Sequence, residues 1–179
     1  MSTSSNIPPP SSNGVFSVSA SILIDAPRDK VWQILLDFPK YREWNPFVRG
    51  QTIVSKTDKR PLNDQTPREG AYLLMSPVHI PPTMDDASVW LSSSSLELIT
   101  VIDHENYRCS WRYVSLPHWL LSADRWQAVS TVLGGGTKYE SLIVFTGLAA
   151  YIMRLFLKSG LQKGFVEMGE ALKNRCEKA

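Results

Sequence analysis

The most constraining feature of this chain is the change of hydrophobic period at its C-terminal end. Apolar residues there recur every three or four positions, which predicts one amphipathic helix of about eight turns. A helix this long needs an apolar surface to lie across, and only a sheet built from the preceding segments could provide it. The residues that carry the period are Ala150, Met153, Leu157, Leu161, Phe165, Met168 and Leu172.

The rest of the chain is dominated by strand patterns. Apolar and polar residues alternate over 15–24, which predicts a half-buried strand. Two short helices are expected next, one ending near Pro39 and one over 41–47 that stops before Pro46. Six further strands are then predicted, at about 48–56, 70–79, 95–103, 107–115, 123–132 and 137–146.

Length and composition favour one domain. A chain of 179 residues can bury one sizeable core but is short for two. Residues 1–14 are rich in Ser and Pro and predict a disordered tail, which leaves 15–179 as a single domain. The loops 57–70 and 76–95 are longer than tight hairpins need, and we expect them to form a rim or lid.

Charge and cysteine content exclude several classes of function. The 19 basic and 17 acidic residues are interspersed, so no nucleic-acid partner is expected. Cys109 and Cys176 are far apart, and no Cys or His spacing suits a metal, which predicts buried reduced thiols and no metal site. The first residues lack a signal-peptide pattern, so we expect a cytoplasmic protein.

Specific residues resemble the START-like, or SRPBCC, helix-grip superfamily, in its polyketide cyclase/dehydrase and lipid-transport branch. The first match is a strand followed by Ala26-Pro27, Val31-Trp32, Asp37 and Tyr41-Arg-Glu-Trp-Asn-Pro46. The second is Phe145-Thr146-Gly147, followed by Gly164-Phe165 and Ala171-Leu172-Lys173. The resemblance covers about residues 15–178.

The resemblance implies an α+β fold in which a curved antiparallel sheet of about seven strands wraps around the long C-terminal helix. Two short helices follow the first strand, and a cavity opens at one end. The family includes ring cyclases, lipid carriers and hormone receptors, and its cyclases share no single catalytic motif, so the fold implies a pocket rather than a reaction. Ile143 stands where many relatives carry a polar side chain, which favours a more apolar cavity.

Bulky and adaptable side chains are abundant enough to line such a cavity. The alternative for each of them is an ordinary place in the core. The candidate ligand-binding residues are Trp44, Phe47, Tyr72, Met75, Trp111, Tyr113, Ile143, Phe145, Met153, Leu157 and Phe165.

Three polar residues are candidates for catalysis. Arg125 and Trp126 are neighbours on one strand, so only one of them can face the cavity, where a guanidinium would hold a carboxylate or an enolate. His118 lies in an apolar stretch expected near the cavity mouth and could act as an acid or base, or be structural. Tyr139 could donate its hydroxyl to a developing enolate, or only pack. Arg112 is expected to face solvent if Trp111 and Tyr113 face inward.

The preferred interpretation is a cofactor-independent cyclase or dehydratase acting on an apolar, polyketide-like intermediate. The rival is a carrier or sensor that binds a lipid unchanged, and a third possibility is a protein-interaction adaptor with a filled cavity. A cyclase requires at least two convergent polar side chains inside the cavity. The apolar segment 148–157 is too short to span a bilayer and is either a cavity lip that touches membranes transiently or a buried helix start. We expect a monomer or homodimer.

Overall fold

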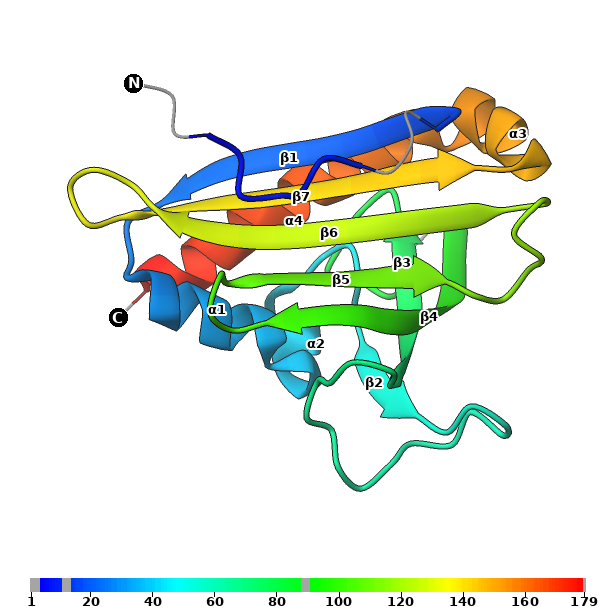
Figure 1. The fold of residues 1–179 in the computed structure, drawn as a ribbon, viewed down its shortest axis with the longest axis horizontal. Helices are drawn as coiled ribbons and strands as arrows, with labels where there is room; N and C mark the ends of the chain where they lie inside the picture. The colour runs from blue at the N-terminus through cyan, green and yellow to red at the C-terminus, as the bar shows by residue number, and fades with distance from the viewer. Residues whose placement is uncertain (1–3, 11–13, 88–90, 179) are drawn as a thin grey trace.

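The computed structural model describes residues 4–10, 14–87 and 91–178. Within them, one antiparallel sheet has the strand order β1-β7-β6-β5-β4-β3-β2 (Figure 1). The predicted helix-grip α+β fold is therefore confirmed. The seven strands are β1 (Phe16–Ile24), β2 (Gln51–Val54), β3 (Tyr72–Ile80), β4 (Leu91–Asp103), β5 (Arg108–Tyr113), β6 (Ser122–Thr131) and β7 (Thr137–Thr146).

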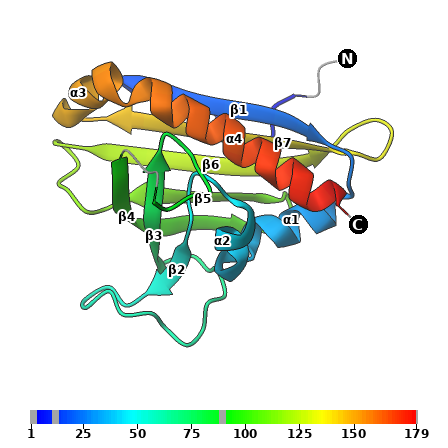
Figure 2. The same ribbon diagram turned by 180° about the vertical axis from the view of Figure 1, so that it is seen from behind.

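The helices form a layer against the concave face of the sheet. The short helices α1 (Arg28–Leu36) and α2 (Tyr41–Trp44), with the 3-10 turn Phe38–Lys40 between them, follow β1 as predicted. The C-terminal helices are α3 (Leu148–Phe156) and α4 (Lys158–Glu177), and α4 packs mainly against β1. Figure 2 shows α4 crossing in front of the sheet diagonally, with α3 beyond its end.

The prediction of one uninterrupted C-terminal helix is wrong, because the helix breaks at Leu157. The backbone of Leu157 stays near the right-handed helical region, at φ −114 and ψ −17. Its carbonyl still accepts the N–H of Leu161 at 2.9 Å. The apolar period therefore continues through the break, which is why the sequence shows one helix where the structure has two.

The serine-rich stretch before residue 95 is also different from its prediction. The sequence predicts a loop over 76–95, but β3 extends to Ile80 and β4 begins at Leu91. Val78 pairs with Ser93, and His79 pairs with Ser92. Pairing with β3 therefore holds these serines in a strand, although a serine run does not itself predict one. In the other direction, β2 is shorter than predicted, since only Gln51–Val54 pair in the ladder.

The N-terminal segment 4–10 lies on the face of the sheet that is turned away from α4 (Figure 1). The backbone N–H of Asn6 donates to Glu140 at 3.0 Å, and its side-chain amide donates to the carbonyls of Asn106 and Val129 at 2.8 and 3.1 Å. Residues 4–10 of the predicted disordered tail thus have defined contacts. Residues 1–3 and 11–13 lie outside the described part of the chain.

Candidate functional site

A cavity of about 280 Å³ lies between the concave face of the sheet and the C-terminal helices. Its walls come from β3 to β7, from the turn after α2, from the end of the β5–β6 loop, and from α3, α4 and the residue between them. Nine of the eleven predicted ligand-binding residues are on these walls. They are Phe47, Met75, Trp111, Tyr113, Ile143, Phe145, Met153, Leu157 and Phe165.

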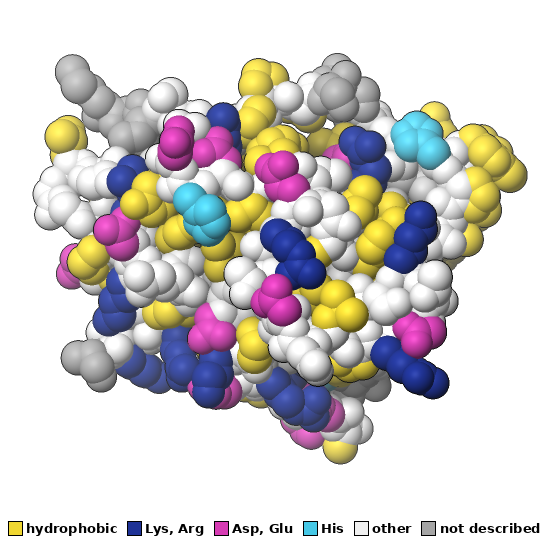
Figure 3. Space-filling view, turned by 60° about the horizontal axis from the view of Figure 1, so that its bottom comes forward, with side chains coloured by type: hydrophobic (Ala, Val, Ile, Leu, Met, Phe, Trp, Pro, Cys, Tyr) yellow, Lys and Arg dark blue, Asp and Glu magenta, His cyan; other side chains and the backbone are white. Residues whose placement is uncertain are grey.

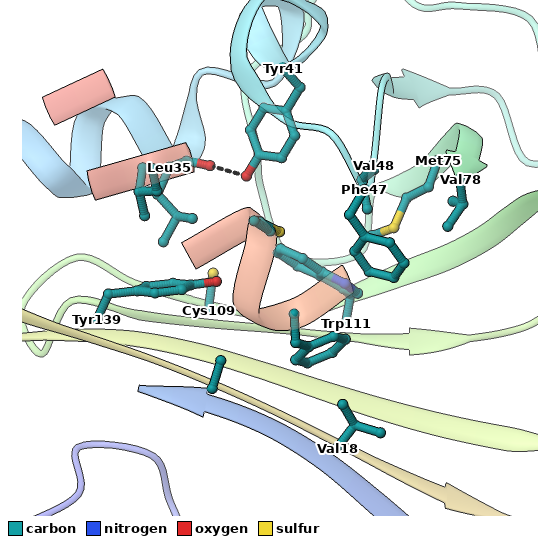
Figure 4. Close-up of a cluster of buried hydrophobic side chains, with 14 of the residues drawn as sticks. Val18, Leu35, Tyr41, Phe47, Val48, Met75, Val78, Cys109, Trp111 and Tyr139 are labelled. Atoms are coloured by element: carbon teal, nitrogen blue, oxygen red, sulfur yellow. Dashed lines mark hydrogen bonds between the residues drawn. The ribbon is translucent and has the colours of Figure 1, made fainter. Parts of the chain in front are cut away.

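Phe47 owes its position to the turn that ends α2. The Asn45 side-chain oxygen accepts the backbone N–H groups of Phe47 and Val48 at 2.9 and 3.0 Å. This turn directs the Phe47 ring toward α4, where its centroid lies 5.9 Å from that of Phe165. Gly164 makes the approach possible, because a Cβ atom there would lie 2.4 Å from the Phe47 ring. Figure 4 shows Phe47, Met75 and Val78 gathered beside Trp111.

Two of the predicted ligand-binding residues lie elsewhere. Trp44 is buried against Tyr41, with ring centroids 4.8 Å apart, and does not line the cavity. Tyr72 is at the start of β3, where Lys56 Nζ lies 5.7 Å from its ring centroid. Both aromatic side chains belong to the structural framework rather than to the cavity wall.

Arg125 faces the cavity, and Trp126 faces the outer side of the sheet beside Pro9 and Pro10. The Arg125 side chain is buried, with 4% of its residue surface exposed. Its guanidinium carbon lies 4.4 Å from the Phe165 ring centroid and 5.9 Å from that of Trp111. Arg112 points outward, as the sequence predicts for an inward-facing Trp111 and Tyr113, and its Nε donates to Asp124 at 2.6 Å.

The hydrogen bonds of Arg125 are few and long for a buried cation. Its Nε donates to Ser141 Oγ at 3.4 Å, and its Nη2 donates to Gln127 Oε1 at 3.4 Å and Met168 Sδ at 3.2 Å. Among the described residues, no carboxylate lies within ion-pair distance of this guanidinium. A buried charge is costly without a close counter-charge, so the site is suited to an anionic group supplied from the cavity.

Glu97 is the polar residue that the sequence analysis missed. It lies on β4 opposite Tyr113, lines the same cavity as Arg125, and has 8% of its surface exposed. Burial raises the pKa of Glu97 to about 8, although a hydrogen bond from Ser95 and the positive charge of Arg125 both act to lower it. The carboxyl group is therefore mostly protonated at neutral pH.

Glu97 and Arg125 lie on the two strands that flank β5. Arg125 is paired with Trp111 across β5 and β6, and Glu97 is paired with Tyr113 across β4 and β5. Two aromatic side chains of β5 therefore separate them. The Trp111 ring contributes a buried Nε1 donor that has no hydrogen-bond partner in the described structure. The cavity thus has an apolar wall and a polar strip formed by Glu97, Trp111, Arg125 and the serines Ser93, Ser94 and Ser95.

The structure does not place His118 or Tyr139 on the cavity wall. His118 is exposed in the β5–β6 loop. Tyr139 is fully buried, and its hydroxyl donates to Gln127 Oε1 at 2.5 Å. Burial raises the pKa of Tyr139. Gln127 Oε1 also accepts from Arg125, so Tyr139 is linked to the guanidinium through Gln127.

Other reactive groups offer little chemistry. Cys109 and Cys176 are free and buried, which confirms their predicted state, and desolvation raises the pKa of the Cys109 thiol to about 12. Across residues 4–10, 14–87 and 91–178, no group of three or more His, Cys, Asp or Glu side chains could hold a metal ion. No helix in the same ranges is long and apolar enough to cross a bilayer.

The fold and its internal cavity together define a START-like helix-grip protein. Solved structures that are similar include hypothetical protein jhp0584 from Helicobacter pylori, with a TM-score of 0.75, 11% identity and 99% of each chain covered. The Zhui aromatase/cyclase from Streptomyces sp. R1128 has a TM-score of 0.68 and 14% identity over 90% of this chain and 93% of that one. A START superfamily protein from Mycobacterium smegmatis has a TM-score of 0.60 and 15% identity, with 90% and 97% covered.

At these identities the similar structures show the fold alone. The family follows from the sequence: residues 15–177 match the family described as polyketide cyclase / dehydrase and lipid transport, and the chain belongs to it. No curated protein matches the chain.

Proposed function

We propose that this protein encloses an apolar molecule with several carbonyl groups and catalyses its ring closure or dehydration without a cofactor. The observation that carries the proposal is the presence of Glu97 and Arg125 in one largely apolar cavity. A carboxyl group with a pKa of about 8 can accept and return protons near neutral pH. A buried guanidinium without a carboxylate partner is suited to a charge that develops during a reaction.

The reaction would begin with the ionised form of Glu97, which removes a proton from a carbon between two carbonyl groups. The electron pair moves onto a carbonyl oxygen, and Arg125 stabilises that enolate. The enolate carbon then bonds to a second carbonyl carbon of the same molecule. The new alkoxide takes the proton back from Glu97. A further proton removal by Glu97, with the proton returned to the departing hydroxyl, releases water.

The cavity would contribute by restricting the shape of the substrate. Bulky side chains on both the sheet and the helices leave about 280 Å³, which limits the conformations that a bound chain can adopt. Holding two reacting carbons close together supplies much of the rate enhancement of an intramolecular reaction. Membership of a family of polyketide cyclases and dehydrases supports chemistry of this class, and so does the likeness to the Streptomyces aromatase/cyclase.

The second candidate is a carrier that binds an apolar ligand unchanged. The apolar lining favours it, since most of the wall would contact a lipid chain as readily as a polyketide. Lipid transport is also among the activities by which the family is described. The two candidates differ in whether Glu97 is needed for anything beyond binding.

The test is to incubate the protein with a short poly-β-ketone thioester and follow the cyclised products by mass spectrometry. For the enzyme, wild type accelerates ring closure or changes the product ratio, and Glu97→Gln returns both to the spontaneous values while retaining ligand binding. Arg125→Met should also lose activity. Glu170→Gln and Arg112→Met, at exposed positions, are the matched controls. A thioester that binds and is released unchanged by wild type would exclude the enzyme and support the carrier.

A further inference from the structure

One end of the molecule exposes a group of large apolar side chains that the cavity does not use. They come from α3 and from the β5–β6 loop, and the most exposed are Leu155 at 78% and Phe156 at 76%. We call this group the end surface. Its members are Leu116, Trp119, Leu148, Tyr151, Ile152, Leu155 and Phe156.

The two parts of the end surface lie side by side because the loop and the helix are bonded to each other. The N–H of Leu148 donates to the Trp119 carbonyl at 3.2 Å, and that of Ala149 donates to the Leu120 carbonyl at 2.8 Å. Figure 3 shows apolar side chains gathered at the right-hand end of the molecule, where Figure 1 places α3 and the β5–β6 loop. A contiguous apolar surface of this kind usually marks an interaction site.

The segments that form the end surface carry charges of one sign. Residues 141–166 contain no Asp or Glu, although the whole chain has 17. The same stretch carries three exposed cations, Arg154, Lys158 and Lys163. Residues 115–121 contain neither Asp nor Glu. Apolar side chains flanked by cations complement the acyl boundary and the headgroups of an anionic membrane.

The opposite side of the same helical segment belongs to the cavity. Met153, Leu157 and Leu161 line the cavity, whereas Leu155 and Phe156 point to solvent. The nine residues of α3 are too few to cross a bilayer, so this helix would lie in the plane of the interface. Contact with a membrane would then place the lip of the cavity at the lipid surface.

We propose that the end surface docks on anionic membranes and that the cavity exchanges its apolar ligand directly with the lipid phase. The surface does not favour a second copy of the chain, because a two-fold contact centred on α3 would bring Arg154 and Lys158 near their own equivalents. The proposal is independent of whether Glu97 performs chemistry.

The experiment is vesicle flotation of the full chain with phosphatidylcholine alone and with phosphatidylcholine mixed with phosphatidylserine. Wild type should float with the mixed vesicles, bind phosphatidylcholine at least tenfold more weakly, and lose binding at high salt. The double variant Leu155→Ser/Phe156→Ser should lose binding. Arg154→Gln/Lys158→Gln should weaken binding to the mixed vesicles only.

Leu133→Ser is the matched control, because Leu133 is 90% exposed on the β6–β7 turn and is not part of the end surface. It should bind as wild type does, and circular dichroism checks that every variant is folded. Equal binding to both vesicle types, or full binding by the Leu155→Ser/Phe156→Ser variant, would overturn the proposal. So would a wild-type dimer in analytical ultracentrifugation that this double variant converts to a monomer, since the surface would then be a subunit interface.

Discussion

At the scale of single residues, the cavity is defined by two buried groups whose charges do not form a pair. Alternation could not tell whether Arg125 or Trp126 faces inward, because both sides of β6 are covered, one by α4 and the other by the N-terminal segment. Glu97 was missed for a related reason. It lies between Leu96 and Leu98, so the apolar pattern favours an outward carboxylate, whereas the structure turns it inward.

Glu97 should make the stability of the folded protein depend on pH. Its folded-state pKa is raised to about 8 from 4.5, so the protonated form is favoured by folding and its contribution is complete below about pH 4.5. That contribution is lost as the pH rises through about 8. Thermal unfolding should show the melting temperature of wild type falling relative to Glu97→Gln between about pH 4.5 and about pH 8, and levelling off above that. Parallel curves for the two proteins would contradict the raised pKa.

Arg125 should lower the free energy of unfolding of the protein but strengthen the binding of an anionic ligand. Because its guanidinium is buried without a carboxylate partner, Arg125→Met should raise the free energy of unfolding by roughly 1 kcal/mol or more. The same variant should bind the anionic probe 1-anilinonaphthalene-8-sulfonate at least tenfold more weakly, while its affinity for the uncharged N-phenyl-1-naphthylamine changes little. Urea unfolding and fluorescence titration measure the two effects. Equal losses for both probes would show that Arg125 only shapes the cavity.

At the scale of elements, the sequence predicts whether a segment is a helix or a strand better than it predicts where that element begins and ends. The strands and the short helices are where their patterns indicate, but the break at Leu157 and the extension of β4 through the serines are not visible in the local sequence. Both depend on partners distant in the chain: β3 pairs with the serines, and the β5–β6 loop holds the start of α3. The apolar loop around His118 suggested a cavity mouth, although its exposed apolar residues Leu116 and Trp119 belong to the end surface.

The contact between α4 and the turn after α2 depends on Gly164. Gly164→Ala would place a Cβ atom 2.4 Å from the Phe47 ring, so Phe47 must move. We expect a net loss of about 1–2 kcal/mol, since overpacking outweighs the gain of up to about 1 kcal/mol from helix propensity. Ser159→Ala, at an exposed position on the same helix, is the control, measured by urea unfolding. A variant that is more stable than wild type would show that Phe47 adapts freely.

At the scale of the whole molecule, the helix-grip architecture follows from features that are explicit in the sequence. The alternating strands, the two short helices and the final amphipathic segment leave few ways to cover the sheet. The sequence does not predict which residues line the cavity. Phe47 and Phe165 on its wall have the same residue type and similar burial as Phe16 and Phe38 in the filled core. Only the three-dimensional arrangement decides where side chains leave a space.

Filling the cavity should separate stability from binding. Ala123 lines it, so Ala123→Leu adds apolar volume to empty space and should leave stability unchanged or higher. The variant should bind 1-anilinonaphthalene-8-sulfonate at least tenfold more weakly. Thr131→Leu, at the exposed end of the same strand, should bind as wild type does. Unchanged probe binding by Ala123→Leu would place the ligand elsewhere.

The pairing of β1 with β7 determines when this protein can fold during synthesis. β1 is an edge strand whose neighbour in the sheet is β7, and the helix that covers it, α4, comes later still. The first strand to leave the ribosome must therefore wait for the last strand and the last helix. Contacts this distant in sequence form slowly, so the nascent domain should remain dependent on chaperones until α4 has been synthesised and has left the ribosome.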